Sequence, residues 1–123
     1  YEIMPSLVGS EMCIRDRFKI ADMVTELVAA RTITRLAAYK IDQGDNEATT
    51  YSAMAKRFAT DVGFNVCNEA LQIFGGYGYI QDYPLERNVR DVRVHQILEG
   101  TNEIMKMIIG RRMVMEDAAS IIQ

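Results

Sequence analysis

The sequence holds few of the residues that bind metals or form disulfides. It has two cysteines, Cys13 and Cys67, and one histidine, His95, among its 123 residues. The cysteines lie far apart and form no Cys-x-x-Cys pair, so neither a disulfide framework nor a zinc site is predicted. Val92 stands three residues before His95, which excludes the Glu-x-x-His motif of di-iron helical bundles. We therefore expect no metal.

Long hydrophobic runs and an excess of one charge are also missing. No apolar run approaches the roughly 18 residues of a membrane-spanning helix, and the N-terminus lacks the basic segment and apolar core of a secretory signal. The 14 Lys and Arg nearly balance the 17 Asp and Glu, so the net charge of −3 indicates neither a nucleic-acid surface nor an anionic-membrane patch. We expect a soluble, intracellular, single-domain protein that binds neither nucleic acid nor membrane.

Apolar residues recur at the spacing of three and four that is typical of amphipathic helices, without a strand pattern or an internal repeat. Short turns between long helices favour antiparallel neighbours, so we predict an all-α antiparallel helical bundle. The first helix has a wide apolar face and is expected to contact two neighbours. The predicted helices cover residues 18–43, 48–74, 84–98 and 101–118, and the last is expected to turn Ile104, Met107, Ile108 and Met115 inward.

Residues 1–17 differ from the rest of the chain. They carry Pro5 and Gly9 and show no sustained periodicity. The piece from Ser6 to Arg17 resembles a string that recurs in translated environmental sequence data as adapter read-through. We therefore expect residues 1–17 to be a non-native leader and residues 18–123 to form the domain.

Residues 97–104 place a carboxylate, a glycine and a hydroxyl at the start of the last predicted helix. Gly100 breaks the preceding helical pattern, and Thr101 is a good N-cap for the next one. A carboxylate fixed on such a bend beside Ile97 and Leu98 can be partly desolvated, which would make Glu99 a stronger base. The alternative is that Glu99 is a solvated residue favoured by the helix dipole. Both interpretations stay open.

Two further patterns have both a functional and a structural interpretation, and a third has a structural one. Gly75, Gly76 and Gly78 predict either a tight turn or a backbone that approaches a ligand such as a phosphate. His95 lies four residues before Glu99 and could share a proton or a metal with it, although a lone histidine on a charged helix is more often a surface residue. The mixed charges of residues 86–93 are typical of a solvated, salt-bridged helix face.

Four stretches together closely resemble the C-terminal helical domain of the acyl-CoA dehydrogenases. They are Leu71-Gln72-Ile73-Phe74-Gly75-Gly76-Tyr77-Gly78-Tyr79, Tyr83-Pro84-Leu85-Glu86-Arg87, Val89-Arg90-Asp91 and His95-Gln96-Ile97-Leu98-Glu99-Gly100-Thr101-Asn102-Glu103-Ile104. The resemblance covers about Phe18 to Met115, and the glycine cluster and the Glu-Gly-Thr bend occur at the family's spacing. Within the family the sequence looks most like the isobutyryl-CoA and short-chain branched type, in which the bend reads Gln-Ile-Leu-Glu-Gly.

The resemblance implies an FAD-dependent oxidoreductase that converts acyl-CoA thioesters to 2-enoyl-CoA. In that family a base removes the α-proton while a hydride leaves the β-carbon for the flavin, and the electrons pass to electron-transfer flavoprotein. Glu99 matches the catalytic base, and Gly100 and Arg111 match substrate-contacting positions. The positions that match FAD contacts are Thr101, Asn102 and Glu103 and, for the ADP half across a dimer interface, Gln72, Ile73, Phe74, Gly75 and Gly76.

The resemblance also implies a homotetramer in a bacterial cytoplasm or a mitochondrial matrix. The family's N-terminal helical domain and middle β-domain, which bind most of the flavin, have no counterpart in this chain. We therefore expect a fragment that is inactive alone and binds flavin weakly or not at all. Two alternatives remain: a non-catalytic helical packing module, and a relative of the acyl-CoA oxidase or nitroalkane-oxidising type, whose reduced flavin would react rapidly with oxygen.

Overall fold

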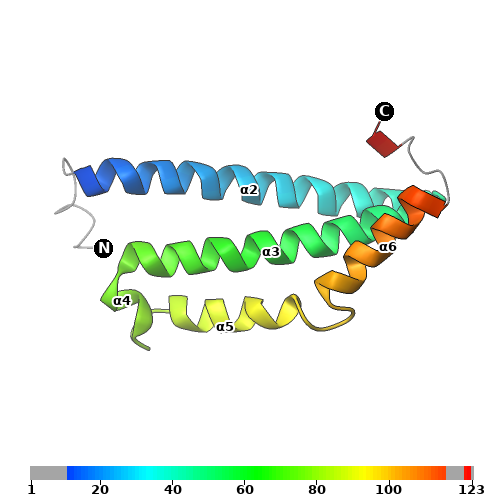
Figure 1. The fold of residues 1–123 in the computed structure, drawn as a ribbon. Helices are drawn as coiled ribbons and strands as arrows, with labels where there is room; N and C mark the ends of the chain where they lie inside the picture. Colours follow the sequence, from blue (N-terminus) through cyan, green and yellow to red (C-terminus); the bar gives the residue numbers. More distant parts are fainter. Residues whose placement is uncertain (1–10, 116–120, 123) are drawn as a thin grey trace.

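The computed structural model of the protein describes residues 11–115 and 121–122, and its long elements are all helices (Figure 1). They are α2 (Glu11–Asp42), α3 (Ala48–Phe74), the short α4 (Gly76–Tyr79), α5 (Leu85–His95) and α6 (Asn102–Met115). No strand occurs within these described ranges. The predicted all-α fold is confirmed.

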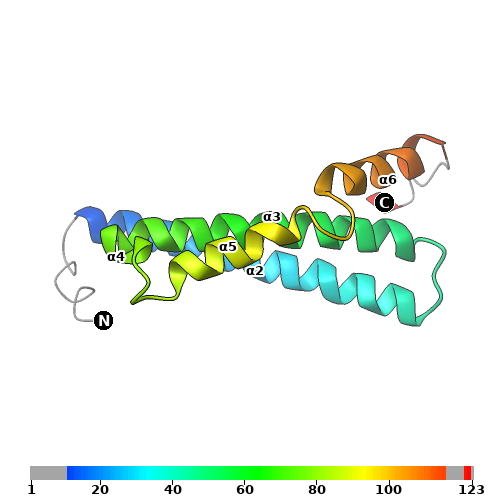
Figure 2. The same ribbon diagram turned by 90° about the horizontal axis from the view of Figure 1, so that it is seen from below.

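Helix α3 is the centre of the arrangement. It packs against α2 on one side and against α4, α5 and α6 on the other, whereas α2 packs against α3 alone among the described helices. Figure 1 shows α2 and α3 running antiparallel along their length, with α5 below the C-terminal half of α3 and α6 leaving at an angle. Seen from below, α6 lies to one side of the α2–α3 pair and diverges from α3 (Figure 2). The bend between α5 and α6 therefore rests on the side of α3.

The predicted first helix begins earlier than expected. It starts at Glu11 rather than at Phe18, because residues 11–17 contain neither proline nor glycine and continue the helical backbone. A helical conformation there does not test whether residues 1–17 are native, and residues 1–10 lie outside the described residues. The predicted end is confirmed: α2 stops at Asp42, and Gly44 follows with φ 65°. Residues 116–118, predicted to end the last helix, also lie outside the described part.

The contact between α2 and α3 is built from small side chains. The buried apolar residues of the described chain are Ala30, Ala37, Ala53, Ala55 and Val62. On α2, Ala30 and Ala37 are buried, and the half-buried positions are Asp16, Lys19, Met23, Ile33 and Lys40. These positions recur at spacings of three, four and seven residues, as in a narrow seam between two helices. The seam covers only part of the wide apolar face, so the expected second neighbour of this helix is not another described helix of this chain.

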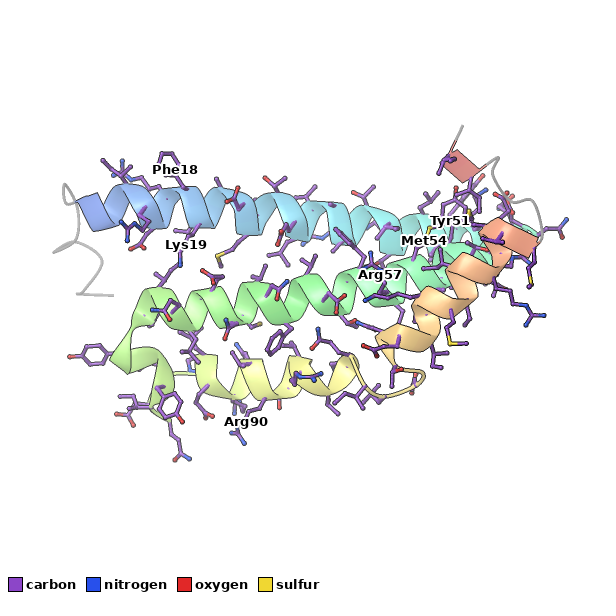
Figure 3. All side chains as sticks on the ribbon, in the orientation of Figure 1. Phe18, Lys19, Tyr51, Met54, Arg57 and Arg90 are labelled. Atoms are coloured by element: carbon purple, nitrogen blue, oxygen red, sulfur yellow. The ribbon has the colours of Figure 1, made fainter. Side chains whose placement is uncertain are left out.

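The prediction that the last helix turns its apolar residues inward is wrong for three of the four positions. Ile104, Met107 and Met115 are 45%, 68% and 79% exposed, and only Ile108 is half-buried. The reason is that α6 contacts α3 alone among the described helices and diverges from the bundle (Figure 2). Phe18 on α2 is likewise 67% exposed and points away from α3, whereas Lys19 points toward it (Figure 3).

The charged face predicted for residues 86–93 is confirmed on α5. Arg90 points away from α3 (Figure 3), and its guanidinium pairs with the Glu86 carboxylate at 2.9 Å. Within the described residues, no helix combines the length and the apolar character needed to cross a membrane.

Candidate functional site

The bend between α5 and α6 has an unusual backbone. After α5 ends at His95, the N–H groups of Ile97 and Leu98 donate to the Val94 carbonyl and complete a last turn. Glu99 then has φ 55° and is the non-glycine residue with positive φ in the described chain. A left-handed conformation costs a side-chain-bearing residue about 1–3 kcal/mol and is tolerated where the surrounding structure enforces it. Glu99 is therefore held at a strained position.

Gly100 and Thr101 complete the bend in the way that the sequence predicts. Gly100 has φ 92°, and a Cβ atom at this position would lie 2.6 Å from the Met105 Cε, so only glycine fits without a shift. Thr101 precedes α6, and its Oγ1 accepts the N–H of Ile104 at 3.4 Å, while its carbonyl accepts the N–H of Met105. The predicted N-cap at Thr101 is confirmed.

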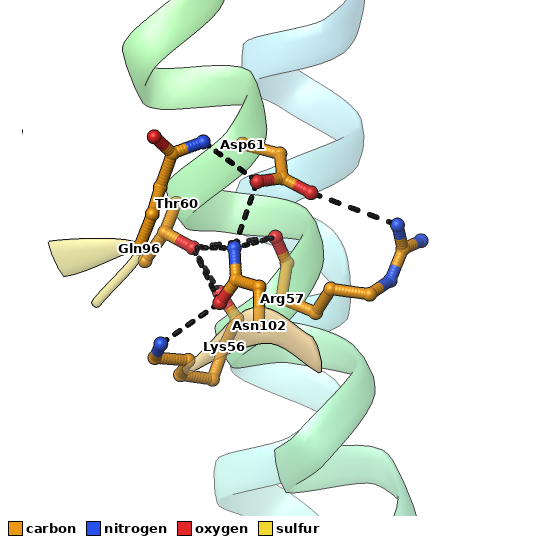
Figure 4. Close-up of polar contacts among 6 residues, drawn as sticks. All are labelled: Lys56, Arg57, Thr60, Asp61, Gln96 and Asn102. Carbon is orange, nitrogen blue, oxygen red and sulfur yellow. Dashed lines mark hydrogen bonds and ion pairs between the residues drawn. The ribbon is translucent and has the colours of Figure 1, made fainter. Parts of the chain in front are cut away.

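The two ends of the bend are tied to one carboxylate of α3 (Figure 4). Gln96 Nε2 and Asn102 Nδ2 each donate to Asp61 Oδ1 at 2.7 Å, and the Asn102 N–H donates to the Gln96 carbonyl at 3.1 Å. Asn102 is 5% exposed, and its Nδ2 also donates to Thr60 Oγ1 at 2.9 Å. Asp61 Oδ2 lies 3.7 Å from the Arg57 guanidinium. This polar cluster closes the loop that carries Glu99.

Lys56 supports the same bend from α3. Its Nζ donates to the Gly100 carbonyl at 2.7 Å and to Asn102 Oδ1 at 2.8 Å. Lys56, Thr60 and Asp61 were not among the residues predicted from the sequence. A sequence pattern that could have indicated them is the spacing of the three polar residues, at positions i, i+4 and i+5 of one helix, between the apolar Ala55 and Val62. We call Lys56, Thr60, Asp61, Gln96 and Asn102 the bend clamp.

The apolar surroundings expected for Glu99 are not supplied within the described chain. Glu99 is exposed, and the neighbouring Ile97 and Leu98 are 53% and 37% exposed. His95 is exposed as well. Desolvation of Glu99 would therefore require a surface from outside the described chain. Within the described residues, no group of three or more His, Cys, Asp and Glu side chains is arranged to hold a metal ion.

The turn at the C-terminal end of α3 contains three glycines, and the backbone requires only two of them to be glycine. Gly75 has φ 60° and ends α3, and a Cβ on Gly78 would lie 2.5 Å from the Leu71 carbonyl oxygen. Gly76 lacks a positive φ, and a Cβ atom added to it would meet no atom within 4 Å beyond its two chain neighbours and the backbone of its own short helix. The fold therefore requires Gly75 and Gly78 but gives no reason for Gly76.

Aromatic rings fix this turn. Tyr83 makes edge-to-face contacts with Phe74 and Tyr77, in both cases with ring centroids 5.8 Å apart. Of the residues predicted to contact the ADP half of FAD, Gln72, Phe74, Gly75 and Gly76 are exposed and Ile73 is half-buried. The turn and Glu99 lie at opposite ends of α5, so this chain does not bring the two predicted FAD segments together (Figure 1).

The two arginines near the end of α6 differ in their surroundings. Arg111, the predicted substrate contact, is exposed. Arg112 instead ties α6 to the start of α3, because its Nε donates to Thr50 Oγ1 at 3.1 Å and its Nη2 to the Asn46 carbonyl at 2.8 Å. Glu103 is exposed on the first turn of α6, next to the buried Asn102.

Comparison with known proteins assigns the chain to a family. The model of the acyl-CoA dehydrogenase C-terminal domain matches residues 16–114. The mitochondrial isobutyryl-CoA dehydrogenase of Dictyostelium discoideum is 52% identical over 101 residues, which are 82% of this chain and 24% of that protein. The chain therefore spans about a quarter of the length of this curated relative.

Solved structures agree with the sequence comparison. Butyryl-CoA dehydrogenase from Megasphaera elsdenii matches with a TM-score of 0.81 and 42% identity, over 87% of this chain and 28% of that one. A chain from a study of the electron-transferring flavoprotein of Acidaminococcus fermentans matches with a TM-score of 0.77 and 43% identity, over 80% of this chain and 26% of that one. The chain belongs to the acyl-CoA dehydrogenase family, and its helices form that family's C-terminal domain.

Proposed function

We propose that this chain is part of a longer FAD-dependent acyl-CoA dehydrogenase, in which Glu99 is the base that removes the α-proton of an acyl-CoA thioester. The observation that carries the proposal is the strained, clamped conformation of Glu99. A glutamate with φ 55° is unfavourable where glycine would be relaxed, and such outliers cluster at functional sites. Packing alone does not account for a carboxylate at this position, since the Glu99 side chain is exposed.

The chemistry requires a positioned base. An α-proton beside a thioester is weakly acidic, so its removal needs a carboxylate at a fixed distance and donors for the developing enolate oxygen. Bound FAD would supply the acceptor for the hydride that leaves the β-carbon. In this chain, Glu99 would take the proton at a carboxylate oxygen, and Gly100 would leave room for the thioester because it has no side chain.

Gly76 supports the proposed cofactor. A Cβ atom there would meet no atom within 4 Å beyond its two chain neighbours and the backbone of its own short helix, and the backbone does not require glycine. Close approach of a ligand from outside the chain supplies a reason, and the residues proposed to face the ADP half of FAD are Gln72, Ile73, Phe74, Gly75 and Gly76. Thr101 and Glu103, at the start of α6, are proposed to face the flavin side through a helix N-terminus, a favourable site for a phosphate. Asn102 would face the cofactor only through its backbone, because its side chain is directed into the bend clamp.

Apolar surface supports the proposed homotetramer. Val24, Val28 and Ile41 on α2 and Met107 on α6 are more than half exposed, and contact with other domains or copies would cover such faces. The same burial would desolvate Glu99.

We further propose short branched acyl-CoA thioesters as substrates, with Arg111 near the coenzyme A moiety, and electron-transfer flavoprotein as the electron acceptor. The mitochondrial and bacterial relatives support a mitochondrial matrix or a bacterial cytoplasm as the location.

The test supplies the part of a relative's length that the match with this chain does not cover. Residues 16–114 are inserted in place of the matching segment of the Dictyostelium discoideum relative, and the purified chimera is mixed with isobutyryl-CoA without oxygen. We expect bleaching of the oxidised flavin in the chimera and a rate lower by about 10²–10⁴-fold in its Glu99→Gln variant. Equal bleaching in both proteins would contradict the role of Glu99 and favour a packing module. Rapid reoxidation of the reduced flavin by oxygen would identify an oxidase-type relative instead.

A further inference from the structure

We propose that Lys56 is a positioning residue for Glu99: its ammonium fixes the Gly100 peptide and, through Asn102, the left-handed conformation of the bend. The catalytic consequence rests on the function proposed above, whereas the effect of Lys56 on the bend does not. Lys56 lies on α3, and the bend lies between α5 and α6, so its contacts join segments far apart in the sequence. Figure 4 shows the one with Asn102.

The first support is the choice of partners. Lys56 donates to two neutral oxygens, the Gly100 carbonyl at 2.7 Å and the Asn102 side-chain carbonyl at 2.8 Å. Lys19 and Lys40, by contrast, both pair with carboxylates, Glu69 and Asp45 respectively. Hydrogen bonds from a charged donor are roughly twice as strong as neutral ones, so an ammonium is a firm anchor for a backbone carbonyl. The Lys56 ammonium therefore restrains the bend through both of these bonds.

The second support is the part of the bend that Lys56 restrains. Gly100 has no side chain and would otherwise sample many backbone conformations. The Asn102 N–H bond to Gln96 joins the two ends of the loop but does not itself involve the Gly100 carbonyl. The Lys56 bond removes this rotation, because the carbonyl must face α3. With the ends and this peptide fixed, the short loop has less freedom to leave the conformation in which Glu99 has φ 55°.

The third support is the way in which Lys56 joins the rest of the bend clamp. Asn102 Oδ1 faces Lys56, while its Nδ2 faces Thr60 and Asp61. Asn102 is thus oriented by a donor on one side and by acceptors on the other, which determines the direction of its amide. Loss of Lys56 removes a charged donor to this oxygen and weakens the whole arrangement.

The test on the 123-residue chain uses amide hydrogen exchange. In Lys56→Met we expect the Asn102 N–H to exchange about tenfold faster relative to amides in the middle of α3. Loss of a hydrogen bond from a charged donor changes a local opening equilibrium by about this factor. Lys19→Met is the matched control, because it removes the same charge from a residue whose partner, Glu69, lies far from the bend. Unchanged exchange at Asn102 in Lys56→Met would overturn the proposal.

A second measurement needs no variant and applies even if Lys56→Met does not fold. The Nζ protons of lysines can be followed by ¹⁵N NMR in the unmodified chain. We expect those of Lys56 to exchange with water about tenfold more slowly than those of the exposed Lys106. Equal exchange at the two ammonium groups would also overturn the proposal.

The catalytic consequence is measured in the chimera described above. A misplaced base lowers the rate of the chemical step without weakening substrate binding, so Lys56→Met should lower kcat by about 10²-fold with little change in KM. A chimera that is active and keeps its kcat after Lys56→Met would contradict the positioning role. A chimera that is inactive before any substitution would count against the proposed function alone, because the exchange measurements still decide whether Lys56 holds the bend.

Discussion

The N–H of Asn102 donates to the carbonyl oxygen of Gln96 at 3.1 Å, and this bond closes the loop that carries Glu99. Both residues also donate from their side chains to the same Asp61 oxygen at 2.7 Å. The loop is therefore fixed at its base by one helix, α3, and only its tip is exposed. An exposed carboxylate on a rigid base is suited to meet a substrate supplied by other parts of a larger protein.

The strain at Glu99 predicts a variant that gains stability and loses function. In Glu99→Gly the left-handed backbone becomes relaxed, so the free energy of unfolding should rise by about 1 kcal/mol. Glu99→Gln retains the strain and should leave the stability unchanged. Thermal unfolding of the 123-residue chain, followed by circular dichroism, compares the two. A Glu99→Gly variant less stable than the wild type would show that the conformation of Glu99 is not strained.

Removal of the buried amide should destabilise the bend. Asn102→Ala removes one hydrogen-bond partner each from Asp61 and Lys56, and the expected loss is about 1–3 kcal/mol of unfolding free energy. Asn68→Ala is the control, because Asn68 is exposed on α3 and its replacement should change stability by less than about 0.5 kcal/mol. Urea denaturation measures both. Equal effects of the two substitutions would contradict the structural role of Asn102.

Substitutions at two glycines of the turn, Gly78 and Gly76, should have different effects, because the first has a structural role and the second is proposed to face a ligand. Gly78→Ala places a Cβ 2.5 Å from the Leu71 carbonyl oxygen and should cost about 1–3 kcal/mol of stability. The Cβ of Gly76→Ala meets no atom within 4 Å beyond its two chain neighbours and the backbone of its own short helix, so this variant should fold normally. In the chimera, however, Gly76→Ala should lower the FAD content of the purified protein. Full retention of FAD in Gly76→Ala would argue against a cofactor at this turn.

The turn between α2 and α3 predicts a dependence of stability on pH. The Lys40 ammonium, at 2.8 Å, and the Glu47 N–H hold the pKa of the Asp45 carboxyl below its ordinary value of 3.8. The same contact raises the pKa of Lys40 above 10.5. The Asp45 contribution to stability is therefore present above about pH 4 and is lost as the pH falls through the lowered pKa, while that of Lys40 is lost as the pH rises above 10.5.

Melting temperatures at several pH values test this dependence. Asp45→Asn should melt below the wild type at pH 7. The difference should shrink below about pH 4, where the carboxyl of the unfolded wild type takes up a proton, and it should vanish once the pH is below the lowered pKa of the folded state. Asp42→Asn removes the same charge from an exposed position at the end of α2 and should not lower the melting temperature. A difference between Asp45→Asn and wild type that persists unchanged at pH 3 would rule out the ion pair as its cause.

Local sequence signals predicted the breaks between helices well. Gly44 and Thr101 occupy the predicted C-terminal and N-cap positions, because the requirements for a left-handed residue and for a capping hydroxyl are local. The spacing of apolar residues likewise identified the helices. It did not reveal how many neighbours each helix has in this chain, so Met107 and Met115 were expected to face inward although they are exposed.

The bend clamp was not predictable from local patterns. Lys56 and Asp61 contact residues 96–102, and such long-range polar contacts depend on the packing of α5 and α6 against α3. Glu99 was identified as a candidate base from its sequence neighbourhood and from the family resemblance. Its positive φ, by contrast, becomes visible only in three dimensions.

The most direct test of Glu99 as the base follows the proton itself. With the flavin of the chimera reduced in advance, hydride transfer is blocked, so exchange of the isobutyryl-CoA α-proton with deuterated solvent reports proton abstraction alone. Exchange is followed by NMR in the wild-type chimera and in Glu99→Gln. We predict that the substitution slows exchange by about 10²–10⁴-fold. Equal exchange rates in the two proteins would contradict the assignment of Glu99.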